Sequence, residues 1–259
     1  MAVTGLHVDL SGRRALVTGA GQGVGREISL YLADAGAEVV VNDIDEARAK
    51  AVAAEVQAVG RGDAIAFDVT DWDGVRSSVE QTGPFDILVN NAGNAGVDGW
   101  SGIKPFAESE PSEWAGFVNV NLYGVMHCTR AALPGMIERR DGRIITVISE
   151  AARSGDANLA AYAAAKAGAA GFCRVIAREV GRYGITVNCV ALGTIIPHDL
   201  DPATDGQDER SAKMISKYVI RRRGQPKDAA GLVTYLASPS AEWITGQTYP
   251  VNGGYSFGL

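Results

Sequence analysis

The chain alternates short runs of β-branched residues with longer amphipathic or alanine-rich stretches along its whole length. This alternation is typical of parallel strands joined by crossover helices. Right-handed crossovers place the carboxyl ends of all the strands at one edge of the sheet, where such sheets bind their ligands. The expected strands are Arg14–Thr18, Glu38–Asp43, Ala64–Asp68, Asp86–Asn90, Gly142–Ser149, Thr186–Ala191 and Gln247–Val251. The expected helices are Gly23–Ala35, Asp45–Val59, Trp72–Gln81, Ser112–Arg139, Ala160–Tyr183 and Lys227–Ala237.

The predicted fold class is α/β, with one doubly wound, seven-stranded parallel sheet that carries helices on both faces. No proline- or serine-rich linker and no internal repeat divides the chain, so a single domain is predicted over residues 1–259. A chain of 259 residues with 46% hydrophobic residues can bury a core without disulfides or metals. Two segments, about 93–113 and 193–225, interrupt the alternation after strands at the ligand edge, and we expect them to be substrate loops.

Charge and composition exclude several classes of partner. A formal net charge of −6 argues against general binding to nucleic acid or to anionic membranes. No stretch reaches about 18 uninterrupted apolar residues, the length that a membrane span needs. Cys128, Cys173 and Cys189 lie in apolar runs without Cys-x-x-Cys spacing, which predicts reduced core residues, and the three scattered histidines predict no metal centre. We therefore expect a cytoplasmic protein.

A glycine-rich turn, Thr18–Gly25, follows the first expected strand and precedes the first helix. Glycines allow a tight turn and let the backbone approach a pyrophosphate, while the helix start supplies free N–H groups and the positive end of its dipole. The alternative is a purely structural strand-to-helix turn, but the position after the first strand favours a dinucleotide site. The residues predicted to bind the dinucleotide here are Gly19, Gln22, Gly23, Val24 and Gly25.

Asp43 ends the second strand, eighteen residues after Gly25. A carboxylate at this place can accept both hydroxyls of the adenosine ribose and repels the 2′-phosphate of NADP. No arginine or lysine lies in the glycine-rich turn or directly after Asp43 to receive that phosphate. The sequence therefore predicts NAD in preference to NADP.

Two further strand ends are predicted to contact the cofactor. At the end of the third strand Asp68 suits a contact to the adenine amino group, although capping of the next helix by a neighbouring residue is a competing use of this turn. At the end of the fourth strand, Asn90–Gly93 combines amides that can tie strands together with a glycine that lets the chain pass close to a ligand. The predicted contacts at these two ends are Asp68, Val69, Asn91, Ala92 and Gly93.

Four polar residues form the predicted catalytic group. Tyr162 and Lys166 lie one turn apart on one face of an alanine-rich helix, so the ammonium is expected to lower the pKa of the phenol and make the pair a general acid and base. Ser149 ends the fifth strand and can hydrogen-bond the reacting oxygen, and the alternative is an ordinary serine at a strand end. Asn121 is unusual inside a helix and can hold a water that connects the lysine to solvent.

In their order and spacing these motifs resemble the classical short-chain dehydrogenase/reductase family over essentially the whole chain, which implies a Rossmann-type fold and often a homotetramer. The family's Thr-Gly-x-x-x-Gly-x-Gly corresponds to 18–25, and its Asn-Asn-Ala-Gly to 90–93. The resemblance implies that Tyr162 exchanges a proton with the substrate oxygen and Lys166 binds the nicotinamide ribose. It further implies that Ser149 polarises the carbonyl and Asn121 holds the relay water.

One segment departs from the family pattern. After the sixth strand the family usually has Pro-Gly and, four residues beyond that glycine, a threonine that contacts the carboxamide. Here Leu192 replaces the proline and Pro197 replaces the threonine. Anchoring of the nicotinamide is therefore assigned to Thr194 and to the backbone of Ile195.

The resemblance extends, in several stretches, to family members that act on hydroxyacyl or oxoacyl thioesters, including those of coenzyme A. We expect an NAD(H)-dependent oxidoreductase that interconverts a secondary alcohol and a ketone on such a small-molecule substrate. Basic residues of the second loop can meet coenzyme A phosphates, or they can simply form a solvated rim; they are Lys213, Lys217, Arg221, Arg222 and Arg223. The alternatives are a hydroxysteroid, sugar or cyclic-alcohol dehydrogenase, a non-catalytic dinucleotide-binding protein, and an epimerase or dehydratase of the related extended family.

Overall fold

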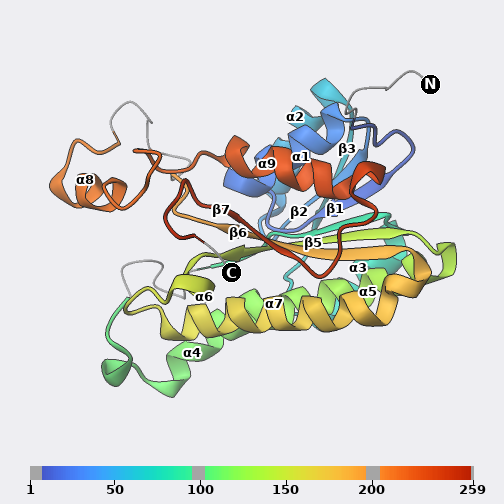
Figure 1. Ribbon diagram of the computed structural model, residues 1–259. Coiled ribbons are helices and arrows are strands. Elements are labelled where there is room, and N and C mark those ends of the chain that lie inside the picture. Colours follow the sequence, from blue (N-terminus) through green and yellow to red (C-terminus); the bar gives the residue numbers. More distant parts are fainter. Residues whose placement is uncertain (1–7, 95–102, 197–204, 258–259) are drawn as a thin grey trace.

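The computed structural model describes residues 8–94, 103–196 and 205–257. Seven parallel strands form one sheet in the order β3-β2-β1-β4-β5-β6-β7 (Figure 1). The order runs outward in both directions from β1 and β4, which makes the sheet doubly wound and confirms the predicted fold class. The strands are β1 (Arg14–Val17), β2 (Glu38–Asp43), β3 (Arg61–Ala66), β4 (Ile87–Asn90), β5 (Gly142–Ser149), β6 (Ile185–Leu192) and β7 (Thr248–Val251).

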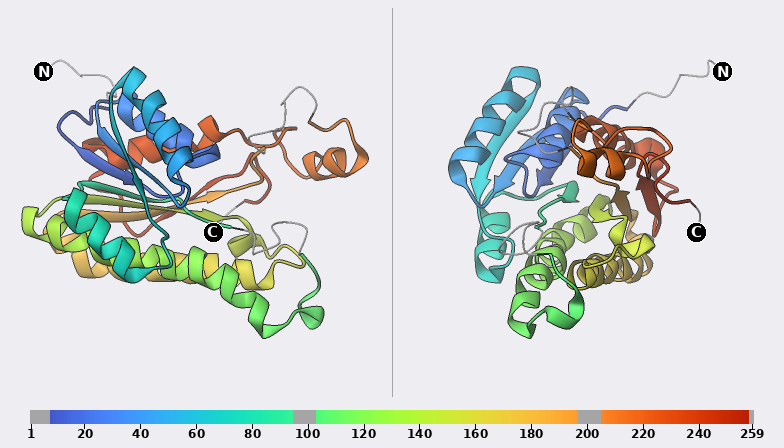
Figure 2. Two further views of the ribbon diagram at one scale, coloured as in Figure 1. Left: turned by 180° about the vertical axis from the view of Figure 1, so that it is seen from behind. Right: turned by 90° about the vertical axis from the view of Figure 1, so that its left-hand side faces the viewer.

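Helices cover both faces of the sheet, and the end-on view of Figure 2 shows the three layers. On one face lie α1 (Gly23–Asp34), α2 (Glu46–Val59) and α9 (Pro226–Ala237). On the other lie α3 (Trp72–Thr82), α4 (Pro111–Val118), α5 (Gly124–Arg139) and α7 (Ala160–Val180). Two short helices, α6 (Ala151–Ser154) and α8 (Glu209–Ile215), lie beyond the carboxyl edge of the sheet.

The central strands are buried on both faces. In β1, Val17 faces the core beneath α1 and α9, whereas its neighbour Leu16 faces the core beneath α5 and α7. In β4, Val89 and Leu88 divide in the same way. Because successive side chains point to opposite faces and both are covered, these strands read as continuous apolar runs in the sequence.

Two elements differ from the sequence prediction by more than small shifts at their ends. The third strand was expected over Ala64–Asp68, but β3 begins at Arg61 and ends at Ala66. It is an edge strand that pairs only with β2, so polar residues alternate along it and mask its start. The helix expected over Ser112–Arg139 is interrupted by a π-helical segment, Asn119–Tyr123, which separates α4 from α5.

The short helices α6 and α8 were not expected. Each is a local turn of the chain beyond the sheet, too short to show a helical repeat in the sequence. Of the two predicted substrate loops, residues 95–102 and 197–204 lie outside the described residues, and Pro197 is among them.

The three cysteines are free and buried, as predicted. Cys173 on α7 donates to the Thr146 hydroxyl of β5 at 3.3 Å, which links the helix to the sheet. Within the described ranges no helix is long and apolar enough to cross a membrane. The same ranges hold no group of three or more His, Cys, Asp or Glu side chains that could bind a metal ion.

Candidate active site

The glycine-rich turn between β1 and α1 offers a cradle for phosphate groups. Gly19 and Gly23 have φ of +59° and +56°, a conformation that residues with a Cβ rarely adopt. A Cβ on Gly19 would also lie 2.7 Å from the Cα of Ala92, so β4's extension crosses directly over the turn. Gln22 begins α1 without a capping side-chain hydrogen bond, and the first turn of α1 contains no acidic residue. The first amides of α1 are therefore suited to an anion such as a pyrophosphate.

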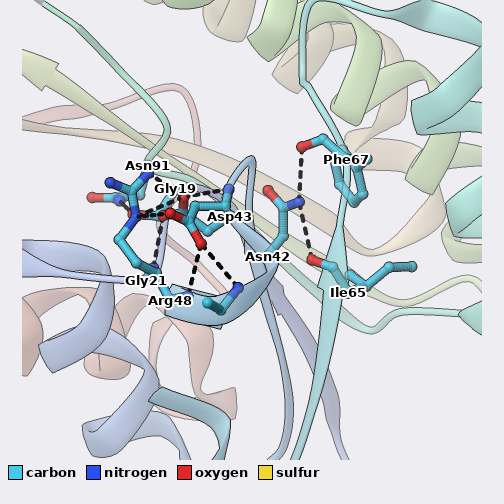
Figure 3. A network of polar contacts seen from close by, with 10 residues as sticks. Gly19, Gly21, Asn42, Asp43, Arg48, Ile65, Phe67 and Asn91 are labelled. Carbon is cyan, nitrogen blue, oxygen red and sulfur yellow. Dashed lines mark hydrogen bonds and ion pairs between the residues drawn. The ribbon is translucent and has the colours of Figure 1, made fainter. Parts of the chain in front are cut away.

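Asn91 braces this turn from the end of β4. Its Nδ2 donates to the carbonyls of Thr18 at 3.0 Å and Gly19 at 2.9 Å (Figure 3). A Cβ on Gly25 would lie 2.4 Å from that Nδ2, so a glycine is required for this packing. Asn91, predicted as a cofactor contact, thus uses its side chain to hold the phosphate turn in place.

Asn90, the last residue of β4, ties secondary structure elements together as its position suggested. Its Nδ2 donates to the Thr129 hydroxyl of α5 at 3.1 Å and to the Thr146 hydroxyl of β5 at 3.4 Å. The side chain is buried, so these bonds satisfy its amide nitrogen, whereas its Oδ1 has no hydrogen-bond partner among the described residues.

Asp43 lies beside the glycine-rich turn and is already heavily hydrogen-bonded (Figure 3). Its Oδ2 accepts from the Gly21 amide at 3.0 Å, and its Oδ1 accepts from the Asp45 amide at 3.0 Å. The guanidinium of Arg48 binds the same Oδ1, with Nη2 at 2.8 Å. The carboxylate side chain is 6% exposed and that of Arg48 is 42% exposed, so the arginine is the more accessible of the pair.

Arg48 was missed in the sequence, where a basic residue was sought only within the turn or directly after Asp43. Asp45 caps α2 by accepting from the amides of Ala47 and Arg48, and this first helical turn carries Arg48 back toward the strand end. The hydrogen bond to Asp43 raises the pKa of Arg48, so the guanidinium stays charged. The sequence did contain a signal for this pair: Asp43 ends the strand and Asp45, two residues later, can cap a helix whose first turn contains Arg48.

At the end of the third strand, the capping interpretation holds for Asp71 but not for Thr70. Asp71 caps α3 by accepting from the Asp73 amide at 3.2 Å. Asp68 has left the strand, and its carboxylate accepts from the Thr70 amide at 2.8 Å. Val69 packs under α5, where a Cβ on Gly124 would lie 2.7 Å from its Cγ2. The adenine contacts of Asp68 and Val69 stay predictions.

Three of the predicted residues, Gly93, Asn121 and Lys166, lie close together just beyond the end of β4. A Cβ on Gly93 would lie 3.0 Å from the Oδ1 of Asn121 and 3.1 Å from the Nζ of Lys166. Asn121 is fully buried, and its Nδ2 donates to the Phe117 carbonyl at 2.9 Å and to the Asn94 carbonyl at 3.1 Å. Because the side chain occupies the carbonyl four residues back, it accounts for the π-helical widening at this point.

Ser149 and Tyr162 form the second half of the predicted catalytic group. The two side chains are hydrogen-bonded, and the Ser149 Oγ also accepts from the Ala151 amide at 3.2 Å. The ring of Tyr162 meets that of Phe117 edge-on, with centroids 6.4 Å apart. Strand β5, helix α7 and helix α4 therefore place the serine hydroxyl, the phenol and an apolar wall together.

Burial governs the protonation of this group. It raises the pKa of Tyr162, and the hydrogen bond from Ser149 opposes that shift. It lowers the pKa of Lys166 to about 8, while the Lys166 Nζ donates to the Val147 carbonyl at 3.0 Å. The expected lowering of the tyrosine pKa by the lysine is therefore wrong for this arrangement, because both groups lose solvation and the ammonium is directed to a backbone carbonyl.

The segment after β6 is held by backbone bonds. The Thr194 amide donates to the hydroxyl of Tyr218 at 2.8 Å, and the Thr194 carbonyl accepts from the Gly224 amide at 3.0 Å. Both backbone groups of Thr194 are thus used inside the protein. Ile195 lies beside Gly224, where a Cβ would lie 2.6 Å from its Cδ1. The role of Ile195 toward the nicotinamide stays a prediction.

The basic residues of the second loop are partly engaged within the protein. Arg222 binds Asp228 through two nitrogens at 2.5 and 2.9 Å, and Arg223 pairs with Asp205 at 3.2 Å. Lys213, on α8, and Lys217, just after it, are exposed.

Comparisons with known proteins show the family to which the chain belongs. The enoyl-(acyl carrier protein) reductase family model matches residues 19–256. The 3-oxoacyl-[acyl-carrier-protein] reductase FabG of Vibrio harveyi is 39% identical over 251 residues, which cover 95% of this chain and 98% of that protein.

Two solved structures show the same architecture. A putative NAD(P)-dependent gluconate 5-dehydrogenase from Beutenbergia cavernae with bound NADP aligns with a TM-score of 0.87 and 33% identity, over 96% of this chain and 99% of the other. A 7α-hydroxysteroid dehydrogenase in complex with NADH and 7-oxo glycochenodeoxycholic acid aligns with a TM-score of 0.84 and 34% identity, over 96% of both chains. The chain is a member of the short-chain dehydrogenase/reductase family, an oxidoreductase that interconverts secondary alcohols and ketones.

Proposed function

We propose that this enzyme uses NAD(H) to interconvert a 3-hydroxyacyl and a 3-oxoacyl thioester, such as that of coenzyme A. The observation that carries the chemistry is the hydrogen-bonded Ser149 and Tyr162 at the carboxyl edge, beside Lys166 and the cradle of the glycine-rich turn. The 39% identical acyl-carrier-protein reductase supports a thioester substrate. We also place the enzyme in the cytoplasm, which three buried free cysteines support.

The chain's residues divide the work of the reaction. The free amides at the start of α1 hold the cofactor's phosphates, and the bound dinucleotide supplies or accepts the hydride. Tyr162 stays protonated at neutral pH because burial raises its pKa, so it can donate a proton to the ketone oxygen during reduction. The Ser149 hydroxyl, fixed by Tyr162 and the Ala151 amide, polarises the same oxygen. Lys166, with a pKa of about 8, can return a proton to the phenol near neutral pH.

Replacing Tyr162 by phenylalanine removes only the hydroxyl. We expect Tyr162→Phe to lower kcat by at least about 100-fold, because general acid catalysis contributes about 10²- to 10⁴-fold, and to leave NADH binding unchanged. NADH oxidation is measured with acetoacetyl-CoA, 7-oxo glycochenodeoxycholate, 5-ketogluconate and cyclohexanone, and NADH binding by fluorescence titration. Tyr31→Phe, at an exposed position near the end of α1, is the matched control.

The same panel tests the substrate. The thioester proposal predicts the highest kcat/KM for acetoacetyl-CoA. A higher value for the steroid, the sugar acid or the cyclic ketone would replace it with that class. More than a few per cent of activity in Tyr162→Phe would overturn the role of the phenol.

The proposed preference for NAD depends on the charge of Asp43, and Arg48 weakens this preference because it pairs with that carboxylate. The carboxylate accepts from the Gly21 amide, which fixes it at the rim of the phosphate cradle, where the 2′-position of an adenosine ribose is expected. Arg48 neutralises part of its charge, which weakens the repulsion of a 2′-phosphate. We therefore propose NADH as the preferred cofactor and NADPH as a weaker one.

Asp43 and Arg48 are expected to have opposite effects on the affinity for NADPH. Asp43→Asn should improve NADPH binding relative to NADH about fivefold, since it removes a like charge worth about 1 kcal/mol. Arg48→Ala should weaken NADPH binding about fivefold and leave NADH within about twofold. Fluorescence titration with both cofactors measures these affinities. The control is Arg61→Ala, because Arg61 pairs with Glu38 at the opposite edge of the sheet. Tighter binding of NADPH than NADH to the wild type would contradict the role of Asp43.

Lys166 makes stability depend on pH. Its pKa is about 8 in the folded protein and 10.5 ordinarily, so the penalty for burying the ammonium is present below pH 8 and is relieved as the pH rises toward 10.5. We expect the free energy of unfolding of the wild type to rise by about 3 kcal/mol relative to Lys166→Met over this interval. Urea denaturation at a series of pH values measures it. The exposed Lys50→Met should show a flat difference, and a flat difference for Lys166→Met would contradict the shift.

We further propose a homotetramer built on the outer faces of the α4–α5 and α7 region. Three apolar side chains there are exposed: Tyr123 by 48%, Met126 by 36% and Val175 by 55%. Covering such side chains is a common reason for self-association. Sedimentation equilibrium should give a tetramer for the wild type and smaller species for a Met126→Glu/Val175→Glu double variant. A monomeric wild type would contradict this proposal.

A further inference from the structure

Glu150 is a buried carboxylate that the proposed reaction leaves without a role. It directly follows Ser149, and only 2% of its surface is exposed. Its Oε1 accepts from the Arg153 Nη1 at 2.6 Å, and its Oε2 accepts from the hydroxyl of Ser256. Burial of a carboxylate is costly unless it is paired, so these two partners define the position of the side chain.

Ser256 belongs to the segment that follows β7, residues 252–256, here called the post-β7 segment. Asn252 organises it: its Oδ1 accepts from the Gly254 amide at 3.0 Å, and its Nδ2 donates to the Ser256 carbonyl at 3.0 Å. The Tyr255 amide closes the turn by donating to the Asn252 carbonyl at 2.9 Å. The segment is thus a compact turn built on the end of β7.

The post-β7 segment makes a second contact with the turn formed by α6 and the residues that follow it. The hydroxyl of Tyr255 donates to Asp156, just beyond α6. The two contacts join residues that are 106 and 99 positions apart in the chain. On its other side the ring of Tyr255 packs on that of Tyr218, with centroids 5.2 Å apart, and Tyr218 holds the Thr194 amide. The segment therefore abuts the loops that follow both β5 and β6.

The α6 turn in turn sets the position of the Ser149 hydroxyl. The Glu150 amide donates to the Leu192 carbonyl at 2.9 Å, and the Glu150 carbonyl accepts from the amides of Arg153 and Ser154 at 2.8 Å each. The Ala151 amide, in the first turn of α6, donates to the Ser149 Oγ. A rotation of Glu150 would shift this turn and, with it, the amide that orients Ser149.

We propose that the post-β7 segment positions the active site, with Ser256 and Tyr255 holding Glu150 and the α6 turn so that the Ser149 hydroxyl stays directed at Tyr162. The inference rests on the role proposed for Ser149 in the reaction. Glu150 and Ser256 are positioning residues, since neither belongs to the group expected to touch the substrate.

The test compares four single variants of the full chain. Ser256→Ala removes the hydrogen bond to Glu150, and Ser256→Thr retains a hydroxyl. Tyr255→Phe removes only the bond to Asp156. Phe257→Ala alters the neighbouring side chain, which is 81% exposed, and serves as the control. For each variant, kcat and KM are measured with NADH and the best substrate of the panel. Hydrogen–deuterium exchange of residues 149–156 and NADH binding are measured without substrate.

We expect Ser256→Ala to lower kcat about tenfold, because small displacements of a catalytic group cost activity steeply, and to leave NADH affinity within about twofold. Exchange over residues 149–156 should become faster in Ser256→Ala and, to a smaller extent, in Tyr255→Phe. Ser256→Thr should restore kcat, and Phe257→Ala should match the wild type in every measurement.

Three outcomes would overturn the proposal. Unchanged exchange in Ser256→Ala would show that the post-β7 segment does not hold the α6 turn. Faster exchange with an unchanged kcat per folded molecule would show that the turn does not position Ser149. Equal losses in Phe257→Ala or Ser256→Thr would indicate a general loss of stability. Absence of turnover with every ketone of the panel in the wild type would instead count against the proposed function, while the exchange data would still decide whether the contact holds the turn.

Discussion

The parallel pairing of seven strands is the constraint on which the site depends. Every strand runs in the same direction, so the carboxyl ends of all seven strands lie at one edge of the sheet. The register places Ser149 beside Leu192 and Asn90 beside Thr146. The phosphate turn after β1, the carboxylate after β2 and the serine after β5 are brought to that edge by backbone hydrogen bonds alone. Without this pairing, Ser149 would not meet Tyr162 and Lys166 of helix α7, its partners in the proposed catalytic group.

Burial then gives these side chains their chemistry. Removal from water raises the pKa of Tyr162 and lowers that of Lys166, which moves the pKa of the lysine toward neutral pH. The same removal from water demands partners for groups that stay polar, and the molecule supplies them from distant parts of the chain. Glu150 accepts a hydrogen bond from Ser256, and Asn121 donates to the carbonyls of Asn94 and Phe117. The hydrogen bonds that satisfy these buried polar groups are thereby also the contacts that hold the proposed catalytic group in place.

At the opposite end of the site, Asp43 and Arg48 act on one another before any cofactor arrives. The carboxylate is fixed by the Gly21 amide, and the guanidinium that neutralises it is the more exposed partner. Under the proposed cofactor assignment, selectivity between the two dinucleotides would depend on the pair rather than on the aspartate alone. Of the solved relatives, one binds NADH and another binds NADP.

Much of the architecture was predictable because it is encoded locally. Apolar runs of strand length, an alanine-rich helix and a glycine-rich turn each follow from nearby residues, so the order of elements, the doubly wound sheet and the free, buried cysteines could be predicted. The start of β3 was missed because edge pairing, and not hydrophobicity, makes Arg61–Asp63 a strand. The π-helical segment was missed because its cause is a side chain, Asn121, bonded to a backbone carbonyl.

The sequence by itself determined which chemical groups stand at the strand ends and in what order. Only the tertiary structure decided which of them act on each other: Arg48 on Asp43, Ser256 on Glu150, and Gly93 beside both Asn121 and Lys166. It also decided the direction in which the pKa of Tyr162 moves. The physical reason is that hydrogen bonds and desolvation depend on distances of a few ångströms between residues far apart in the chain. Spacing along a sequence determines such distances within one helix or strand, but not between elements that packing brings together.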